Sequence, residues 1–369
     1  MLFVRAATHA DLDAIARMAQ SARPVLHSLP HDRDALAARI AASEASLRAH
    51  VVAPGEESYL FVLEESDTGQ LFGTSNIVAA AGYPEPFYAF RNDALIHASR
   101  ELQVNRKIHA LTMSHELTGM TRFGGFHIDP PLRGGAAAHL ISRARMMYVA
   151  MHRQRFASHV FSLLPGVTDD AGLSPFWEAV GRKFFGRDFR DIEVASGGRS
   201  RTFIAEVMPA YPLYVPLLPA NAQRVLGEPD PAALLAYQIH LDEGFEPDRY
   251  VDIFDAGPVV TAPVDRTASV VRNEARVVCE VGDTKGDEGV AHLVASERAA
   301  CAAGARDEFR CVVATLPLLS ASRQPATLFT RTGEAPLDAR TRAALGVEPG
   351  DTVRCAPLHR GRHPAGEPR

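Results

Sequence analysis

The stretch that decides the fold is FHIDPPLRGGAAAHL (residues 126–140), an apolar strand end followed by two prolines, one arginine, two glycines and three alanines. A strand that runs through a turn of small residues into a helix leaves the first amides of that helix open. Such amides bind phosphate groups, because the helix dipole and the free N–H donors favour negative charge. A plain turn between a strand and a buried helix explains the same residues, so the neighbouring elements must decide.

The elements around this stretch follow from the spacing of apolar side chains. Apolar residues recur at three and four positions over 136–151, which predicts an amphipathic helix. The run LFVRAA predicts a first strand, and Asp67-Thr68-Gly69 joins two apolar runs into a predicted hairpin. The other elements expected in the first 210 residues are helices over Thr8–Gln20, Asp34–His50 and Pro175–Phe185, and strands at Ala94–Ala98, Lys107–Ser114, Gly124–Ile128, Ala157–Leu163 and Ser200–Glu206.

The chain changes character after this region. Four prolines within 208–219 predict an extended connection, which a helix over Asp230–Asp242 and a strand at Tyr250–Phe254 follow. Short β-rich runs then alternate with turns, at Ser269–Val271, Arg276–Val281 and Phe309–Thr315. We therefore expect an α/β domain over 1–210, a connecting helix and strand over 211–262 that complete the site, a small β-rich domain over 263–358, and a disordered tail over 359–369.

Composition narrows the classes of partner. The 369 residues carry a formal net charge of -5, so we expect neither a nucleic-acid nor a membrane-surface partner. No window approaches the roughly 18 apolar residues needed to span a bilayer. The four cysteines show no CxxC spacing, so no metal site is expected. The simplest interpretation is a cytoplasmic protein that acts on small molecules.

The order of these elements resembles the acyl-CoA N-acyltransferase (GNAT) fold, an α/β (α+β) class with a mixed sheet. In that fold a strand feeds a loop of the form Arg-x-x-Gly-x-Gly/Ala onto a helix. Arg133, Gly134 and Gly135 fit this spacing, with Ala136 and Ala138 where the usual pattern has glycine. The resemblance implies that the loop holds the diphosphate of a coenzyme A thioester.

Several longer stretches carry a closer likeness: GEESYLFVLEESDTGQLFGTSNIVAAAGYPEPFYAFRNDALIHASREL (55–102), KIHALTMSHELTG (107–119) and SPFWEAVGRKFF (174–185). They resemble the arginine N-succinyltransferase family, most nearly the α subunit of the arginine/ornithine enzyme. The resemblance implies transfer of succinyl from succinyl-CoA to the α-amino group of arginine or ornithine, the first step of the arginine succinyltransferase catabolic pathway. It implies no covalently bound cofactor, and a homologous β subunit or a homo-oligomer as partner.

The resemblance also implies roles for single residues. The position for succinyl-CoA binding falls on Phe126, beside His127 and the loop residues Arg133, Gly134, Gly135, Ala136 and Ala138. Asp230 stands where the family has its proton-donor histidine, which weakens the prediction of catalysis at that position. Since a histidine titrates near neutral pH and an aspartate does not, His240 is the alternative acid or base.

The predicted amino-acid pocket consists of Arg91, Asn92 and His115, because a guanidinium matches a substrate carboxylate bidentately. Two alternatives stay open beside arginine succinylation. The chain could be a non-catalytic subunit that stabilises or regulates a succinyltransferase assembly, or an acyltransferase of the same fold with another acyl donor or amine.

Overall fold

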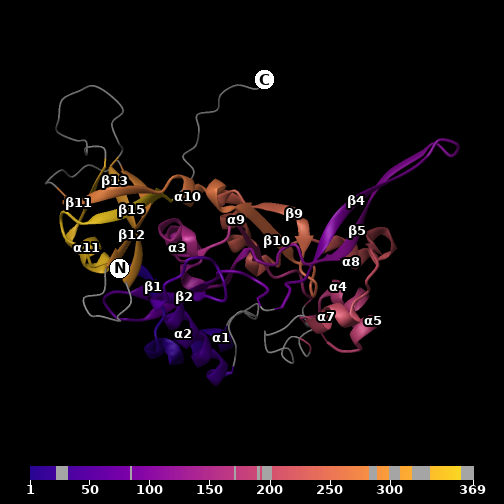
Figure 1. The fold of residues 1–369 in the computed structure, drawn as a ribbon, viewed down its shortest axis with the longest axis horizontal. Helices are drawn as coiled ribbons and strands as arrows, with labels where there is room; N and C mark the ends of the chain where they lie inside the picture. Colours follow the sequence, from indigo (N-terminus) through magenta and orange to yellow (C-terminus); the bar gives the residue numbers. More distant parts are fainter. Residues whose placement is uncertain are drawn as a thin grey trace.

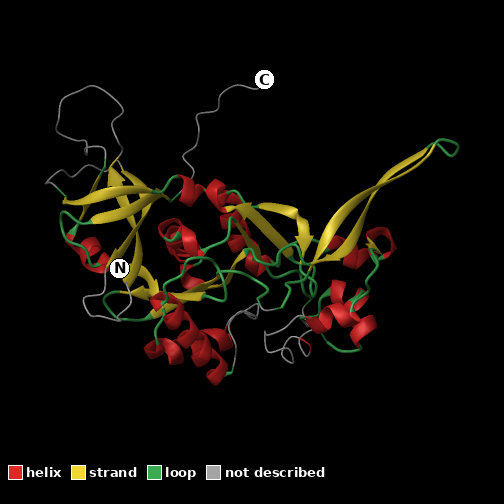
Figure 2. Ribbon diagram, in the orientation of Figure 1, coloured by secondary structure: helices red, strands yellow, loops and turns green. Residues whose placement is uncertain are grey.

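The computed structural model describes residues 1–21, 32–83, 85–169, 172–188, 192, 202–281, 289–298, 308–317 and 333–358. Within these ranges one sheet of 15 strands runs through the molecule in the order β14-β11-β15-β12-β13-β1-β2-β3-β6-β7-β10-β9-β4-β5-β8. Figures 1 and 2 show helices on both sides of this sheet. The predicted tail over 359–369 lies outside the described residues.

The middle of the sheet confirms the expected α/β class with a mixed sheet. Its strands are β1 (Leu2–Ala6), β2 (Ser58–Glu65), β3 (Leu71–Val78), β6 (Thr121–Ile128), β7 (His159–Leu163), β10 (Pro258–Pro263) and β9 (Glu246–Val251). Neighbours pair antiparallel except β6 and β7, which pair in parallel. The predicted hairpin is β2–β3, and the predicted helix after the loop is α3 (Ala136–Met151).

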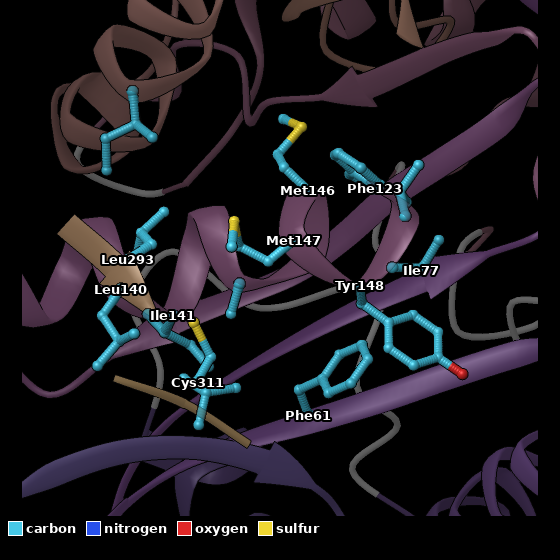
Figure 3. Packing of buried hydrophobic residues seen from close by; sticks show 14 of the residues in the cluster. Phe61, Ile77, Phe123, Leu140, Ile141, Met146, Met147, Tyr148, Leu293 and Cys311 are labelled. Carbon is cyan, nitrogen blue, oxygen red and sulfur yellow. The ribbon is translucent and has the colours of Figure 1, made fainter. Parts of the chain in front are cut away.

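Helix α3 is buried on nearly every side because the sheet curls around it. Figure 3 shows Tyr148 of α3 beside Phe61, with ring centroids 5.3 Å apart, while Leu140 and Ile141 lie near Leu293 of β12 (Gly289–Arg298). All of them belong to one core cluster, which joins the N-terminal strands to the C-terminal ones. A helix surrounded in this way places even its polar side chains in the interior.

The opposite face of the sheet is covered by α1 (Leu12–Ser21) and α2 (Arg33–Arg48). Their apolar side chains form a separate cluster with Leu60 and Val62 of β2. Asp32 caps α2 through the Ala35 amide at 2.7 Å, which satisfies one of the free donors at the helix start. Alternate residues of β2 thus face α3 and the α1–α2 pair.

A long hairpin of β4 (Ala89–Ser99) and β5 (Val104–Ser114) projects from the body (Figures 1 and 2). It contains the strands predicted at Ala94–Ala98 and Lys107–Ser114. At its base β4 pairs with β9, and β5 pairs with β8 (Leu213–Tyr214). The Pro-rich connection therefore contributes a short strand to the sheet.

The C-terminal region is rich in strands, as expected. It contains β11 (Glu274–Glu280), β12, β13 (Glu308–Pro317), β14 (Glu334–Leu337), β15 (Thr352–Pro357) and the helix α11 (Ala339–Leu345). β13 pairs antiparallel with β1, so the sheet continues from the N-terminal strands into this region. The boundaries at 210, 262 and 358 remain predictions.

Two predicted strands are wrong. Ser200–Glu206 falls partly on α7 (Thr202–Val207), whose Ile204 packs with Met208 in a second core cluster. Ser269–Val271 lies in α10 (Ala268–Val271), because the Glu243 carboxylate accepts from the Ser269 amide at 2.8 Å and from its hydroxyl at 2.7 Å. An acceptor from a distant element thus sets the local conformation.

Three further predictions need smaller corrections. The helix expected over Pro175–Phe185 is two short helices, α4 (Pro175–Ala179) and α5 (Gly181–Phe185), which meet at a non-helical Val180. The strand expected at Tyr250–Phe254 is β9, which ends at Val251 before a turn. The helix expected over Asp230–Asp242 begins later, as α9 (Leu234–Glu243). The remaining described helix is α8 (Ala220–Arg224), and short 3-10 turns lie at His9–Asp11, Pro130–Leu132, Arg153–Arg155, Val215–Leu217, Pro231–Ala233 and Val264–Arg266.

Candidate active site

The parallel pairing of β6 with β7 is short. It runs from Thr121 opposite Val160 to Phe123 opposite Ser162, although β6 continues to Ile128. Along residues 124–128, β3 is the strand that pairs with β6 in the described part of the chain. We call residues 124–128 the unpaired β6 edge. Free backbone groups on a strand edge can pair with an extended ligand.

A β-bulge shapes the unpaired β6 edge. The register between β3 and β6 shifts between Thr74 and Asn76, and Gly125 has a φ of 59°. A Cβ on Gly125 would lie 3.2 Å from Asn76 Oδ1, so both the backbone conformation and the space favour glycine here. Phe126, the next residue, packs half-buried against the core around α3. Its side chain therefore packs on the core, and its backbone lies on the unpaired β6 edge.

The loop after β6 leaves several amides without partners. The turn over Pro130–Leu132 leads to Gly135, the N-cap of α3, whose carbonyl accepts from the Ala138 amide at 3.3 Å. The amides of Gly134, Ala136 and Ala137 donate to no backbone acceptor within the described ranges. Ala136 and Ala137 open a sixteen-residue helix and Gly134 directly precedes its N-cap, so all three donors lie at the end of the helix where the dipole favours an anion.

The two glycines of the loop are not required by the fold itself. Neither has a positive φ, and a Cβ on Gly134 or Gly135 would meet nothing within 4 Å. Their lack of a side chain instead keeps the amides open to a ligand. Ala136 is exposed beside them, whereas Ala138 is fully buried in the core and presents no side chain to the loop.

Arg133 and His127 are held at the end of β6. Arg133 Nε donates to the Ile128 carbonyl at 3.2 Å, which ties the guanidinium to the strand. His127 is buried, and its Nε2 lies 3.3 Å from Asp129 Oδ1. Burial lowers the pKa of His127 despite the nearby carboxylate, so this imidazole is neutral near neutral pH.

Asp230 lies beside the end of β7. Its amide donates to the Pro165 carbonyl at 2.8 Å, and its Oδ1 accepts from the Ala232 amide at 2.9 Å. Pro165 follows Ser162 by three residues, as Phe126 follows its partner Phe123. Asp230 therefore lies just beyond the carboxyl end of β7, the strand that pairs with the first half of β6.

His240 is enclosed in the interior on α9. Its Nδ1 lies 2.6 Å from the Ala236 carbonyl, and its Nε2 is buried without a hydrogen-bond partner among the described residues. Burial, with smaller effects from the charges of Arg145 and Arg143, lowers the pKa of His240 to about 3. Such an imidazole is not protonated near neutral pH, so Asp230 is the better placed of the two predicted acid–base groups.

The residues of the predicted amino-acid pocket lie at the base of the hairpin. Arg91 Nε donates to Asp93 Oδ1 at 2.8 Å, and its Nη1 pairs with Glu116. Glu116 also binds the Tyr250 hydroxyl and Arg249, and the hydrogen bond from Tyr250 is the largest cause that lowers its pKa. The Arg91 guanidinium is thus already engaged by two carboxylates.

The other two pocket residues make contacts within the same hairpin base. Asn92 Oδ1 lies 2.8 Å from His109 Nδ1 on β5, and His115 stacks edge-on to Tyr88 with centroids 6.4 Å apart. No group of three or more potential metal ligands occurs in the described ranges. No helix there has the length and apolarity to cross a membrane.

Sequence reasoning overlooked Arg145, which is fully buried on α3 and reaches the unpaired β6 edge at the Gly124 carbonyl. A signal was present. The helix over 136–151 contains two arginines and no acidic residue. A basic side chain in an otherwise apolar helix either reaches solvent or needs an acceptor from elsewhere.

Comparisons with known proteins cover nearly the whole chain. A family model described as "Arginine N-succinyltransferase beta subunit" matches residues 2–269. "Arginine N-succinyltransferase subunit alpha" of Pseudomonas aeruginosa is 42% identical over 354 residues, 96% of this chain and 99% of that protein. An "Arginine N-succinyltransferase" of Photorhabdus laumondii is 34% identical over 358 residues, 97% of this chain and 98% of that protein. The solved structure of arginine/ornithine succinyltransferase subunit AI from Pseudomonas aeruginosa matches with a TM-score of 0.81 and 38% identity, covering 98% of this chain and 99% of that chain.

Proposed function

Because this chain belongs to the arginine N-succinyltransferase family, we propose that it transfers the succinyl group of succinyl-CoA to the α-amino group of arginine or ornithine. One structural observation supports this proposal independently of the sequence similarity. The unpaired β6 edge is followed directly by the open amides of the loop before α3. A coenzyme A thioester has an extended amide-containing arm and a charged diphosphate. These are the two chemistries that the edge and the loop can bind.

In this proposal the loop and the strand position the donor. The amides of Gly134, Ala136 and Ala137 bind the diphosphate, and the pantetheine arm pairs with residues 124–128. The thioester then lies beside Phe126, whose half-buried ring borders the acyl group. Because these groups are fixed by the sheet and by α3, binding orders the donor rather than the protein.

The reaction is direct attack of the amine on the thioester carbonyl. A C–N bond forms and the C–S bond breaks. The ammonium form of the substrate must first lose a proton, and the departing thiolate gains one. Asp230 is the proposed proton carrier, since it lies just beyond the end of β7 and stands at the position of the family's histidine. The neutral imidazole of His127 is the other group beside the edge that can accept a proton.

A partner chain belongs to the same proposal. One similar protein is named an α subunit and the matching family model is named after a β subunit, which supports assembly with a homologous chain or with a second copy. We expect a cytoplasmic location. The second candidate function, a non-catalytic subunit of such an assembly, is favoured by one observation, the aspartate at position 230 in place of histidine.

The test is thiol release by the purified chain with succinyl-CoA, with and without arginine, and identification of the product by mass spectrometry. Ornithine as acceptor and acetyl-CoA as donor serve as controls. We expect succinylarginine or succinylornithine to form, and acetyl-CoA to be used poorly. Turnover that needs an added homologous β chain would support the partner role, and use of acetyl-CoA alone would contradict succinyl transfer.

A further inference from the structure

Helix α3 buries two arginines only two residues apart, and they differ in their partners. Arg143 is 2% exposed and lies 3.3 Å from Glu243 Oε1 and 3.8 Å from Asp242 Oδ2. Its Nη1 also donates to the Leu358 carbonyl. The Arg143 guanidinium therefore forms a buried ion pair with carboxylates of α9, which balance its charge.

Arg145 is fully buried and has no acidic partner in the described part of the chain. Its donors reach three neutral oxygens: the Ser142 carbonyl at 2.9 Å, Ser142 Oγ at 2.8 Å and the Gly124 carbonyl at 3.3 Å. Burial alone lowers its pKa to about 9. A buried cation without an anion is costly, and proteins usually supply a counter-charge.

The unbalanced charge lies beside the proposed donor site. Gly124, whose carbonyl Arg145 contacts, is the first residue of the unpaired β6 edge. The guanidinium carbon lies 4.8 Å from the centroid of the Phe123 ring, the residue just before it. Gly124 and Phe126 are two positions apart in the strand, which is at most about 6.5 Å. The four-carbon succinyl group can cover such a length.

A second buried group nearby also lacks a partner. His240 Nε2 has no hydrogen bond within the described residues, and the charge of Arg145 acts on this imidazole. Each group therefore lacks one partner among the described residues. The guanidinium has no anion, and the imidazole nitrogen has no hydrogen-bond donor, a role that a water molecule bound with the anion can fill.

We propose that Arg145 is the specificity-determining residue for the acyl donor and that it binds the terminal carboxylate of the succinyl group. This rests on the proposed function, because it assumes that the thioester lies beside Phe126. A carboxylate at Arg145 supplies the missing counter-charge. Acyl groups of equal length that end in a methyl leave the cation unpaired, so the site discriminates against them.

The competing explanation is that Arg145 only fastens α3 to β6 through the Gly124 carbonyl. The two explanations differ in what they predict for the acyl groups. A fastening role affects all acyl donors alike, because it changes the position of the strand. A carboxylate-binding role affects succinyl-CoA and spares butyryl-CoA, which has the same number of acyl carbons without the charge.

The experiment measures the dissociation constants of succinyl-CoA and butyryl-CoA by calorimetry, without any amine acceptor. The proteins are the wild type, Arg145→Met, Arg145→Lys and the matched control Arg143→Met. We expect the wild type to favour succinyl-CoA by about 10- to 100-fold, from one or two charge-assisted hydrogen bonds. Arg145→Met should bring this ratio to about 1, with butyryl-CoA binding unchanged within about 3-fold. Arg145→Lys should retain part of the ratio.

Arg143→Met should lower the melting temperature, because it leaves Glu243 buried without its cation, and should leave the donor ratio unchanged. Equal binding of the two donors by the wild type, or an equal loss of both in Arg145→Met, would overturn the assignment. If circular dichroism shows that Arg145→Met does not fold, an unchanged ratio in Arg145→Lys overturns it instead. A chain that binds neither thioester contradicts the proposed function itself, whereas equal binding of both contradicts only the role of Arg145.

Discussion

The unpaired β6 edge and the base of the β4–β5 hairpin are both polar, but they differ in whether their polar groups find partners within the chain. At the hairpin base, Arg91, Asp93, Glu116 and Arg249 form a connected set of ion pairs. At the β6 edge, the loop amides lack backbone acceptors and the nearby Arg145 lacks an acid, within the described residues. The chain satisfies the first region by itself and leaves the second for a ligand.

This difference changes which predicted residues deserve a functional role. Arg91 looked like a carboxylate ligand from its residue type, but its guanidinium already holds two carboxylates. Gly134 and Gly135 are predicted to bind succinyl-CoA, with a plain turn as the alternative, and neither the backbone nor the packing requires them. A cluster of polar groups therefore indicates a binding region only where those groups lack hydrogen-bond or ion-pair partners within the chain.

The largest expected effect concerns His240, whose pKa of about 3 in the folded protein is far below its ordinary value. The unfolded chain binds the proton first as the pH falls, so stability is complete above about pH 6.5 and decreases toward pH 3. The free energy of unfolding should decrease by about 1.4 kcal/mol per pH unit, or about 3 kcal/mol between pH 6 and pH 4. Urea unfolding of the wild type and of His240→Gln measures it.

His127 and His292 also have lowered pKa values and remain in both proteins, so the difference between the two curves isolates His240. Parallel stability curves for the wild type and His240→Gln would show that the pKa of His240 is the same in the folded and the unfolded protein. The imidazole would then not be the enclosed neutral group described above.

The next effect is on turnover at Asp230. Asp230→Asn keeps the hydrogen bond to the Ala232 amide, because asparagine caps a helix turn as well as aspartate does. The melting temperature should stay the same while kcat falls about 100-fold, the lower range for a lost acid–base group. Asp230→His should raise kcat, since histidine titrates near neutral pH. An unchanged kcat in both variants would restrict Asp230 to capping and move the proton transfer to His127.

A smaller effect is expected at the N-cap of α3. Gly135→Asp adds a carboxylate where the diphosphate should bind, in a position with nothing within 4 Å of the new Cβ. Aspartate is a good N-cap, so the protein should gain about 0.5 kcal/mol in stability while its affinity for coenzyme A falls about 10-fold or more. Gly135→Ser is the neutral control and should bind coenzyme A nearly as the wild type does. Equal affinities for all three would remove the loop from the donor site.

The smallest effect should come from the hairpin base. Arg91→Met removes ion pairs that are partly exposed, which costs about 1 kcal/mol or less by thermal unfolding. The KM for arginine should change less than about 3-fold, because a guanidinium bound to two carboxylates is not available to the substrate. A KM raised more than about 10-fold, about the value of one charge-assisted hydrogen bond, would restore Arg91 to the amino-acid pocket.

Local patterns were sufficient for the elements that frame the donor site. The apolar spacing of 136–151 matched α3 in both bounds, and the turn at Asp67-Thr68-Gly69 lies between β2 and β3 as predicted. The small residues of the loop signalled open amides. These features depend on residues close in sequence, where spacing and backbone preference decide the structure.

Other features depend on partners that no local pattern reveals. The helix α10 begins at a carboxylate from α9, and β13 pairs with β1 from the far end of the chain. The bulge at Gly125 and the early end of the β6–β7 pairing are also set by neighbouring strands. For the same reason the state of Arg145 could not be predicted: its residue type was visible, but its missing counter-charge was not.

The most direct test of the contrast between the two regions is hydrogen exchange followed by mass spectrometry, with and without saturating succinyl-CoA. We predict slower exchange for the amides of residues 124–128 and 133–137 in the complex, and unchanged exchange for β4 and β5. Protection of the hairpin base with no change at the β6 edge and the α3 loop would contradict the account.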